Sequence, residues 1–269
     1  MEHWRQERES WDRLAAAMPD LLPAASTQYY RRREIALLAR HAGPLAGQRI
    51  LKLDLWNEAF NTRILNWMSG EGGWTVGLDA GAVISRRAQQ NARAAGDPLH
   101  LLQADIRRLP FADDSFDLVY SMGTIEHIAE CREAVAEIRR VLRVGGRAII
   151  GVPHRWNLFL RPACVVALSW LGKYPYAPER SFGGGELRRL VERGGLSVRA
   201  RTGILTIPGA LRMADLFLHR AGSRLQRLTG LLVRPFEWLE SRVAWSGRLG
   251  YLIVLVAIKP APGPPQGRS

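Results

Sequence analysis

Acidic residues follow two apolar runs of the chain, at positions where a parallel sheet could hold a ligand with a ribose and a purine ring. Asp79 ends the second apolar run, in TVGLDAG, and Asp105 follows the third, Leu99–Gln103. Open α/β sheets bind ligands beyond the carboxyl ends of their strands, where an acid takes the ribose hydroxyls. Asp105 can accept a hydrogen bond from an exocyclic amine while Ile106 packs on the ring. Taken singly, Asp79 is better explained as a strand-end or helix-capping acid and Asp105 as a turn residue.

Two histidines also follow apolar runs and are candidate catalytic residues. His127 comes after Glu126 and the run Phe116–Met122, and His154 lies just past a later run, in VPHRWN. Histidine changes its protonation near neutral pH, which suits a general base. The alternative for His127 is a structural role, in which it packs against the wall of a pocket. The sequence predicts no metal ligands.

The elements that must position these residues alternate between strands and helices. Largely continuous apolar strands joined by helices indicate βαβ units and a buried parallel sheet, and therefore a doubly wound α/β fold. The predicted strands are 49–55, 74–78, 99–103, 116–122, 148–152, 196–202 and 250–259, and the predicted helices are 29–41, 57–68, 82–94, 125–142 and 186–192. Segment 208–246 is rich in leucine and arginine and is predicted to be helical, with Pro235 kinking or splitting the helix.

The 269 residues predict one large domain with insertions. Its expected parts are an N-terminal helical extension (1–47), a Rossmann-like core (48–153), a lid or acceptor-binding region with basic amphipathic helices (154–247), a final sheet strand (248–260) and a disordered tail (261–269). Two cysteines exclude a disulfide framework and a zinc site built on cysteine pairs.

Positive charge is concentrated in the second half of the chain. Residues 1–150 hold 20 Lys and Arg against 19 Asp and Glu, whereas residues 151–269 hold 18 against 6, which makes most of the net charge of +13. This asymmetry favours an anionic partner for the second half, although a solvated basic surface explains it equally well. The charged N-terminus and the lack of a long apolar run predict a cytoplasmic protein.

Four segments together resemble the class I S-adenosylmethionine-dependent methyltransferases, and the branch that includes quinone-biosynthesis enzymes in particular. They are RILKLDLWNEAFNTRIL, VGLDAG, LLQADIRRLPFADDSFDLVYSMGTIEHI and EIRRVLRVGGRAIIGVP. The resemblance covers about residues 48–153 and returns weakly at SFGGGELRRLVERGGL and in the final strand. It implies a seven-stranded sheet whose last strand is antiparallel, with S-adenosylmethionine lying across the ends of the first strands.

The resemblance also implies roles for individual residues. Asp79 is expected to bind the ribose, Asp105 and Ile106 the adenine, and the turn after the first strand the methionine end of the cofactor. The predicted cofactor-binding residues are Leu53, Asp54, Trp56, Glu58, Asp79, Ala80, Asp105, Ile106, Met122 and Gly123.

The turn itself departs from the family. In the family this turn reads as an acid, any residue, then glycines at alternating positions, but here the same register reads Lys52-Leu53-Asp54-Leu55-Trp56-Asn57-Glu58. Glycine is normally needed there for positive φ and for close approach of backbone to cofactor. Either the turn is rebuilt, with Asp54 or Glu58 contacting the ammonium or ribose and Trp56 packing on the cofactor, or the pocket is lost and the domain is a scaffold.

The residues after the fourth strand bear on the reaction. Relatives that methylate base or amide nitrogen carry Asn/Asp-Pro-Pro-aromatic there, whereas this chain has Ser121-Met122-Gly123-Thr124. We therefore expect methyl transfer to oxygen or carbon. Because the sulfonium provides the leaving group, alignment of donor and acceptor is the main task of the protein, and a catalytic motif is not required.

The acceptor is expected to bind to residues 154–247. This region combines apolar runs and many arginines with four tryptophans, Trp156, Trp170, Trp238 and Trp245. Such helices suit an anionic membrane surface, and their arginines suit a phosphate or diphosphate head group. We therefore expect a small, lipid-linked or polyprenyl-linked acceptor, or a glycan carried on one, and peripheral attachment to the inner face of the membrane. The alternative is a lid whose leucines pack on the sheet and whose arginines are solvated.

Three other functions fit parts of the sequence. The missing glycines allow a methyltransferase-fold protein that does not methylate, and the basic second half allows an RNA-modifying methyltransferase. A nicotinamide oxidoreductase would use a similar sheet, but it too requires a glycine fingerprint.

Overall fold

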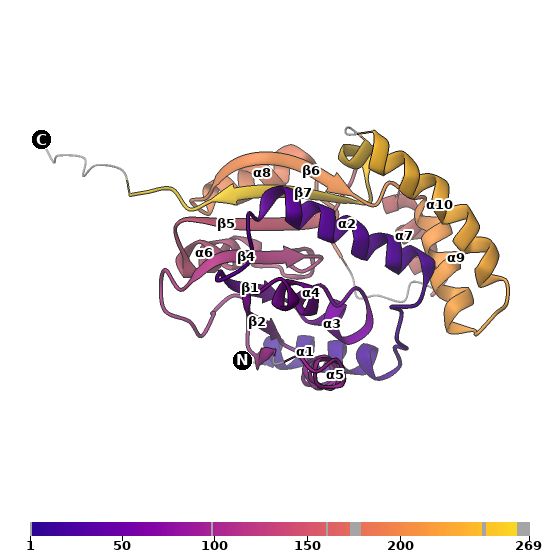
Figure 1. Ribbon diagram of the computed structural model, residues 1–269, viewed down its shortest axis with the longest axis horizontal. Helices are drawn as coiled ribbons and strands as arrows, with labels where there is room; N and C mark the ends of the chain where they lie inside the picture. Colours follow the sequence, from indigo (N-terminus) through magenta and orange to yellow (C-terminus); the bar gives the residue numbers. More distant parts are fainter. Residues whose placement is uncertain (1, 98, 160, 173–178, 244–245, 263–269) are drawn as a thin grey trace, which may run out of the picture.

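The computed structural model describes residues 2–97, 99–159, 161–172, 179–243 and 246–262 (Figure 1). A seven-stranded sheet has the strand order β3-β2-β1-β4-β5-β7-β6, in which β7 runs antiparallel to both of its neighbours and the other pairs are parallel. The strands are β1 (Arg49–Leu53), β2 (Trp74–Asp79), β3 (His100–Gln103), β4 (Phe116–Met122), β5 (Leu142–Pro153), β6 (Ser197–Ile204) and β7 (Leu252–Ile258). The doubly wound α/β fold expected from the sequence is confirmed.

Helices cover both faces of this sheet. They are α1 (Glu2–Ala16), α2 (Ala25–His41), α3 (Trp56–Phe60), α4 (Ile64–Gly70), α5 (Ala82–Ala94), η1 (Ile125–His127), α6 (Cys131–Val141), α7 (Arg161–Trp170), α8 (Gly184–Arg193), α9 (Gly209–Arg220), α10 (Gln226–Arg242) and η2 (Ser246–Leu249). No helix within these described stretches is long and apolar enough to cross a membrane.

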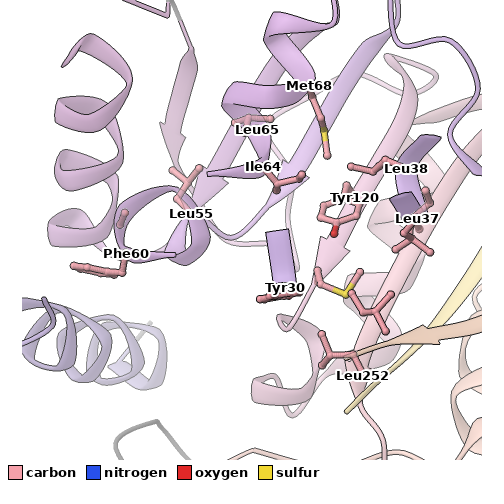
Figure 2. Packing of buried hydrophobic residues seen from close by; sticks show 14 of the residues in the cluster. Tyr30, Leu37, Leu38, Leu55, Phe60, Ile64, Leu65, Met68, Tyr120 and Leu252 are labelled. Atoms are coloured by element: carbon pink, nitrogen blue, oxygen red, sulfur yellow. The ribbon is translucent and has the colours of Figure 1, made fainter. Parts of the chain in front are cut away.

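Alternation along the strands divides the core into two hydrophobic clusters. On β1, Ile50 belongs to the cluster under α2, α4 and α5, while Leu51 and Leu53 belong to the cluster under α6 and α8. Figure 2 shows the first cluster, with Tyr120 of β4 beside Leu37 and Leu38 of α2. Because side chains alternate along a strand, Lys52 shares the face of Ile50 and lies inside this first cluster.

Two predicted helices are interrupted. The helix expected over 57–68 is divided into α3 and α4, because the carbonyl of Asn57 accepts from both Asn61 and Arg63, and Arg63 adopts a φ of 50°. The helix expected over 125–142 is divided because Ile128 is extended, and only Cys131–Val141 forms an α-helix. Pro235 lies within α10, which continues through it without splitting.

Two buried carboxylates attach the C-terminal helices to the rest of the molecule. Glu240 of α10 accepts hydrogen bonds from Arg33, from the Tyr29 hydroxyl and from the backbone N–H of Thr206. Asp215 of α9 accepts from the N–H of Ser26, at the start of α2, at 2.8 Å. Charge-assisted hydrogen bonds of this kind fix α9 and α10 against α2. In Figure 1, α7, α9 and α10 gather at one end of the molecule.

The predicted disordered tail falls largely on residues 263–269, which lie outside the described part of the chain, as does Trp245.

Candidate functional site

A cavity of about 210 Å³ opens along the carboxyl ends of the parallel strands. It crosses from β1 to β4, where the strand order reverses and open α/β sheets bind their ligands. The residues that line it at the strand ends are, in sheet order, Ala104 after β3, Asp79 on β2, Asp54 after β1, Met122 on β4, Pro153 on β5 and Leu252 on β7.

Most of the predicted site residues line this cavity. They are Asp54, Trp56, Asp79, Ala80, Asp105, Ile106, Met122, Gly123 and His127. Leu53, Glu58 and His154 do not line it. Leu53 is fully buried in the cluster on the other face of the sheet, and His154 is a buried histidine whose pKa is lowered by desolvation.

Asp54 takes the backbone conformation that the missing glycine would supply. Its φ is 68°, which is uncommon for a residue with a Cβ but is adopted more readily by Asp and Asn. Its carboxylate accepts hydrogen bonds from the Thr124 hydroxyl at 2.7 Å and from the N–H of Trp56 at 3.1 Å. These two hydrogen bonds stabilise the strained turn, one from the segment after β4 and one from the start of α3.

Glu58 lies at the third glycine position of the turn, but its side chain forms a buried ion pair and does not line the cavity. Lys52 Nζ lies 2.9 Å from Glu58 Oε2, and both side chains are fully buried. The same ammonium donates to the carbonyl of Asp54 at 2.6 Å and lies 3.4 Å from its carboxylate. Three acceptors therefore face the three donors of the lysine. An acid at position 52 would be repelled by Glu58, so the two departures from the family depend on each other.

Several carboxyl groups are buried around this pair. Burial raises the pKa of Asp54 to about 6, against the opposing effect of Lys52. Burial likewise raises the pKa of Glu34, on α2, to about 7. The Tyr120 hydroxyl donates to Glu34 at 2.7 Å. Burial thus shifts the pKa of Asp54, which lines the cavity, and of Glu34, which does not line it, toward neutral pH.

Asp79 connects the ends of β1 and β2. Its two carboxylate oxygens accept from the N–H groups of Leu55 and Gly81, both at 2.7 Å. Burial raises its pKa to about 7, and these two hydrogen bonds oppose the shift. Each carboxylate oxygen can accept a second hydrogen bond, so Asp79 retains capacity for ligand hydroxyls.

Asp105 is held by an arginine at the end of β3. Arg107 lies 2.9 Å from Asp105 and 2.9 Å from Glu130. This pairing fixes the Asp105 carboxylate at the rim of the cavity beside Ile106.

The N-terminal helix supplies a cavity residue that sequence reasoning missed. Trp11 of α1 packs edge-on against Trp56, with ring centroids 5.9 Å apart, and against His127 at 4.9 Å. Asp12 next to it accepts from the N–H of Val83, at the start of α5, and thereby holds α1 in place. No spacing or motif in residues 1–47 distinguishes Trp11 from an ordinary helix residue.

His127 lies beside two carboxylates in the cavity. Glu126, His127 and Glu179 each place one polar atom within 4.8 Å of the others. Glu179 was not among the residues expected from the sequence. The arrangement brings proton-accepting groups together where the cavity passes β4.

Comparisons with known proteins agree with this geometry. Residues 44–150 match the family of the methyltransferase domain. This segment is similar to the class I S-adenosylmethionine-dependent methyltransferases. The match agrees with the span of 48–153 expected from the sequence, and it makes S-adenosylmethionine the cofactor of the domain.

Two sequence relatives and one solved structure are also similar to this chain. The chain is 31% identical over 140 residues to a ubiquinone biosynthesis O-methyltransferase of Methylobacterium, covering 51% of this chain and 56% of that protein. It is 24% identical over 237 residues to a probable S-adenosylmethionine-dependent methyltransferase of Mycolicibacterium smegmatis, covering 85% of each. A putative methyltransferase of Haloferax volcanii, solved with the Trm112 activator, shares the fold with a TM-score of 0.61 at 22% identity, over 97% of this chain and 99% of that one.

The Lys52–Glu58 pair generates the first prediction. Lys52→Met leaves two carboxylates buried without their counter-ion and should lower the free energy of unfolding by about 3–5 kcal/mol, measured by urea denaturation. The Lys52→Met, Glu58→Gln double variant should recover part of this loss, because it removes one of the uncompensated charges. Additive losses in the double variant would contradict the coupling.

Glu34 generates the second prediction. An unfolded glutamate titrates near 4.3, so the folded state binds the extra proton between about pH 4 and 7 and loses stability as the pH rises through that range. Relative to Glu34→Gln, the wild-type free energy of unfolding should fall by roughly 1–3 kcal/mol between pH 5 and 8. Glu71→Gln, at an exposed glutamate, is the control and should not change the slope. Parallel slopes for wild type and Glu34→Gln would exclude the effect.

Proposed function

We propose that this protein transfers a methyl group from S-adenosylmethionine to oxygen or carbon of a small or lipid-linked acceptor. The observation that carries the proposal is the row of carboxylates at the ends of three adjacent strands, Asp54 after β1, Asp79 on β2 and Asp105 after β3, all lining one cavity. Their order follows the order in which the family binds the methionine, ribose and adenine parts of the cofactor.

The residues present fit this cofactor despite the altered turn. Positive φ at Asp54 replaces that of glycine, and Glu58 is paired with Lys52 rather than filling the cavity. Asp54 offers a carboxylate to a cationic ammonium, and Asp79 offers acceptors to the ribose hydroxyls. Ile106 offers an apolar surface to the adenine ring. When bound, S-adenosylmethionine supplies an electrophilic methyl group on a sulfonium whose thioether leaves.

The other residues align the acceptor and exclude water. Trp11 and Trp56 form an aromatic wall that limits the access of water from the side of α1. Gly123, with a φ of 79°, lets the backbone after β4 turn beside the cavity. His127 lines the cavity, and in this proposal it takes the proton from an acceptor hydroxyl or acidic carbon. Alignment of the reacting atoms supplies most of the rate enhancement.

Asp79→Ala should raise the Kd of S-adenosylhomocysteine by about tenfold to hundredfold, the loss of about 1–3 kcal/mol of hydrogen bonding, in calorimetric titrations. The control is Asp113→Ala, because Asp113 is exposed and does not line the cavity. The thermal unfolding of both variants is compared, since Asp79 also holds Leu55 and Gly81. Unchanged affinity in a folded Asp79→Ala variant would contradict the assignment.

We further propose that α10 attaches the protein to an anionic membrane surface that carries the acceptor. Its inward stripe, including Thr229, Val233 and Glu240, packs on the body of the protein. A second apolar face points outward, and its exposed residues are Leu228, Leu231, Leu232, Trp238 and Leu239. Helical periodicity places these five on one side of the helix.

The charge around this outward face favours anionic lipid. Arg227 and Arg234 are exposed and flank it. Both acidic residues of α10 are paired with α2, Glu237 with Arg32 and Glu240 with Arg33. Trp170, which is 92% exposed, and Val166 add apolar surface on α7, at the same end of the molecule (Figure 1). Exposed leucine and tryptophan bordered by arginine are typical of helices that lie in a membrane interface.

The attachment predicts flotation with phosphatidylglycerol vesicles at low salt. The triple variant Arg224→Gln, Arg227→Gln, Arg234→Gln should bind about a hundredfold more weakly, at about 1 kcal/mol per arginine. Trp238→Ser should also weaken binding, whereas Trp74→Ser, a half-exposed tryptophan on β2, should not. Wild-type protein that remains in the soluble fraction, or equal binding to neutral vesicles, would contradict the proposal.

A further inference from the structure

Arg212 is a buried arginine at the far end of the cavity from Asp105. It lies on α9, is 7% exposed, and lines the cavity together with Leu205, Tyr251 and Leu252. These neighbours belong to β7 and to the connections around it, on the other side of β4 from the predicted ribose and adenine residues. The Arg212 end of the cavity is therefore the part that the cofactor residues leave for the acceptor.

The guanidinium of Arg212 is packed between two aromatic rings. Its Cζ lies 5.1 Å from the ring centre of Tyr30 and 5.5 Å from that of Tyr251. Tyr30 and Leu252, both labelled in Figure 2, belong to the first cluster and line the cavity. Asp215, one turn further along α9, holds the helix to the start of α2 and so fixes the position of the arginine.

This guanidinium lacks a carboxylate partner in the described part of the chain. Its Nη1 atom is buried and donates no hydrogen bond to any described residue, and no described carboxylate forms an ion pair with it. Arg107, the other arginine of the lining, is by contrast paired with Asp105 and Glu130. A guanidinium stays charged in proteins, and a buried unpaired charge is costly. An anionic group in the cavity would remove that cost.

We propose that Arg212 binds a carboxylate on the methyl acceptor, which makes the acceptor an organic acid with an apolar or aromatic body. The inference rests on the proposed function, because it assigns the free end of the cavity to the acceptor. Two parallel N–H groups of the planar guanidinium can donate to the two oxygens of a carboxylate. Tyr30, Tyr251 and Leu252 provide a surface for the apolar part of the acceptor.

The charges of the cavity favour a monoanion over a phosphate. The other charged residues of the lining are mostly acidic, namely Asp54, Asp79, Asp105, Glu126 and Glu179. They attract the cationic methyl donor and repel a dianion more strongly than a monoanion. A single guanidinium also carries one positive charge, which balances a carboxylate but only half of a phosphate dianion. The cavity thus has an acidic end for the donor and a cationic end for the acceptor.

The test uses 3-phenylpropanoate, its neutral amide and phenylphosphonate as probes, titrated by saturation-transfer NMR into the full chain with and without S-adenosylhomocysteine. Wild type should bind the carboxylate at least about tenfold more tightly than the amide, the energy of one charge-assisted pair. Arg212→Met should lose this preference and leave amide binding unchanged. Arg212→Gln, which keeps length and polarity, provides a second variant if Arg212→Met does not fold. Arg220→Met, an exposed arginine of the same helix, is the matched control and should behave as wild type.

Each alternative outcome overturns the proposal. Equal binding of carboxylate and amide by wild type would show that no charge is recognised, and an unchanged preference in folded Arg212 variants would place the recognition elsewhere. Tighter binding of phenylphosphonate than of the carboxylate would assign the site to a phosphate group. A titration with S-adenosylhomocysteine alone tests the proposed function separately. If the protein does not bind S-adenosylhomocysteine but prefers the carboxylate over the amide, the proposed function has failed and the role of Arg212 in carboxylate binding has not.

Discussion

The cavity depends on an ion pair buried beneath it. Lys52 and Glu58 replace the acid and the third glycine of the family's turn, and they pair at 2.9 Å with no exposure to solvent. The lysine also binds the backbone of Asp54, which allows that residue to hold the positive φ of a glycine. Burying these charges is costly unless every donor and acceptor is matched. The contacts of Lys52 with both carboxylates and with the Asp54 carbonyl explain how this turn keeps its backbone conformation without glycine.

Around this floor, the parts of the chain outside the methyltransferase domain complete the cavity. The N-terminal α1 adds Trp11 on the side of the cofactor residues, and α9 adds Arg212 on the opposite side. Asp215 and Glu240 anchor α9 and α10 to α2, so their position is fixed by buried charge-assisted bonds rather than by apolar packing alone. This anchoring leaves the outward face of α10, with Leu228, Leu231 and Leu232, exposed in the described part of the structure.

Sequence patterns predicted the sheet well, because buried parallel strands appear in the sequence as apolar runs. The acids at the carboxyl ends of these strands then lie along one edge of the sheet. Asp79, Asp105, Met122 and Gly123 accordingly lie together along one cavity, where the sequence predicts cofactor binding. The direction of a side chain is harder to predict. Glu58 was expected to contact the cofactor, but its carboxylate pairs with Lys52, since alternation along β1 buries that lysine. Trp11 and Arg212 could not be found, because only tertiary packing brings α1 and α9 to the strand ends.

The claim that the glycine-free turn holds a working cofactor site is tested most directly by calorimetric titration of the purified protein with S-adenosylmethionine and S-adenosylhomocysteine. Binding in the micromolar range with one site per chain is the predicted result, about −8 kcal/mol at 1 μM. Absence of heat with millimolar ligand, from protein that unfolds cooperatively, would contradict the account and leave the domain as a scaffold.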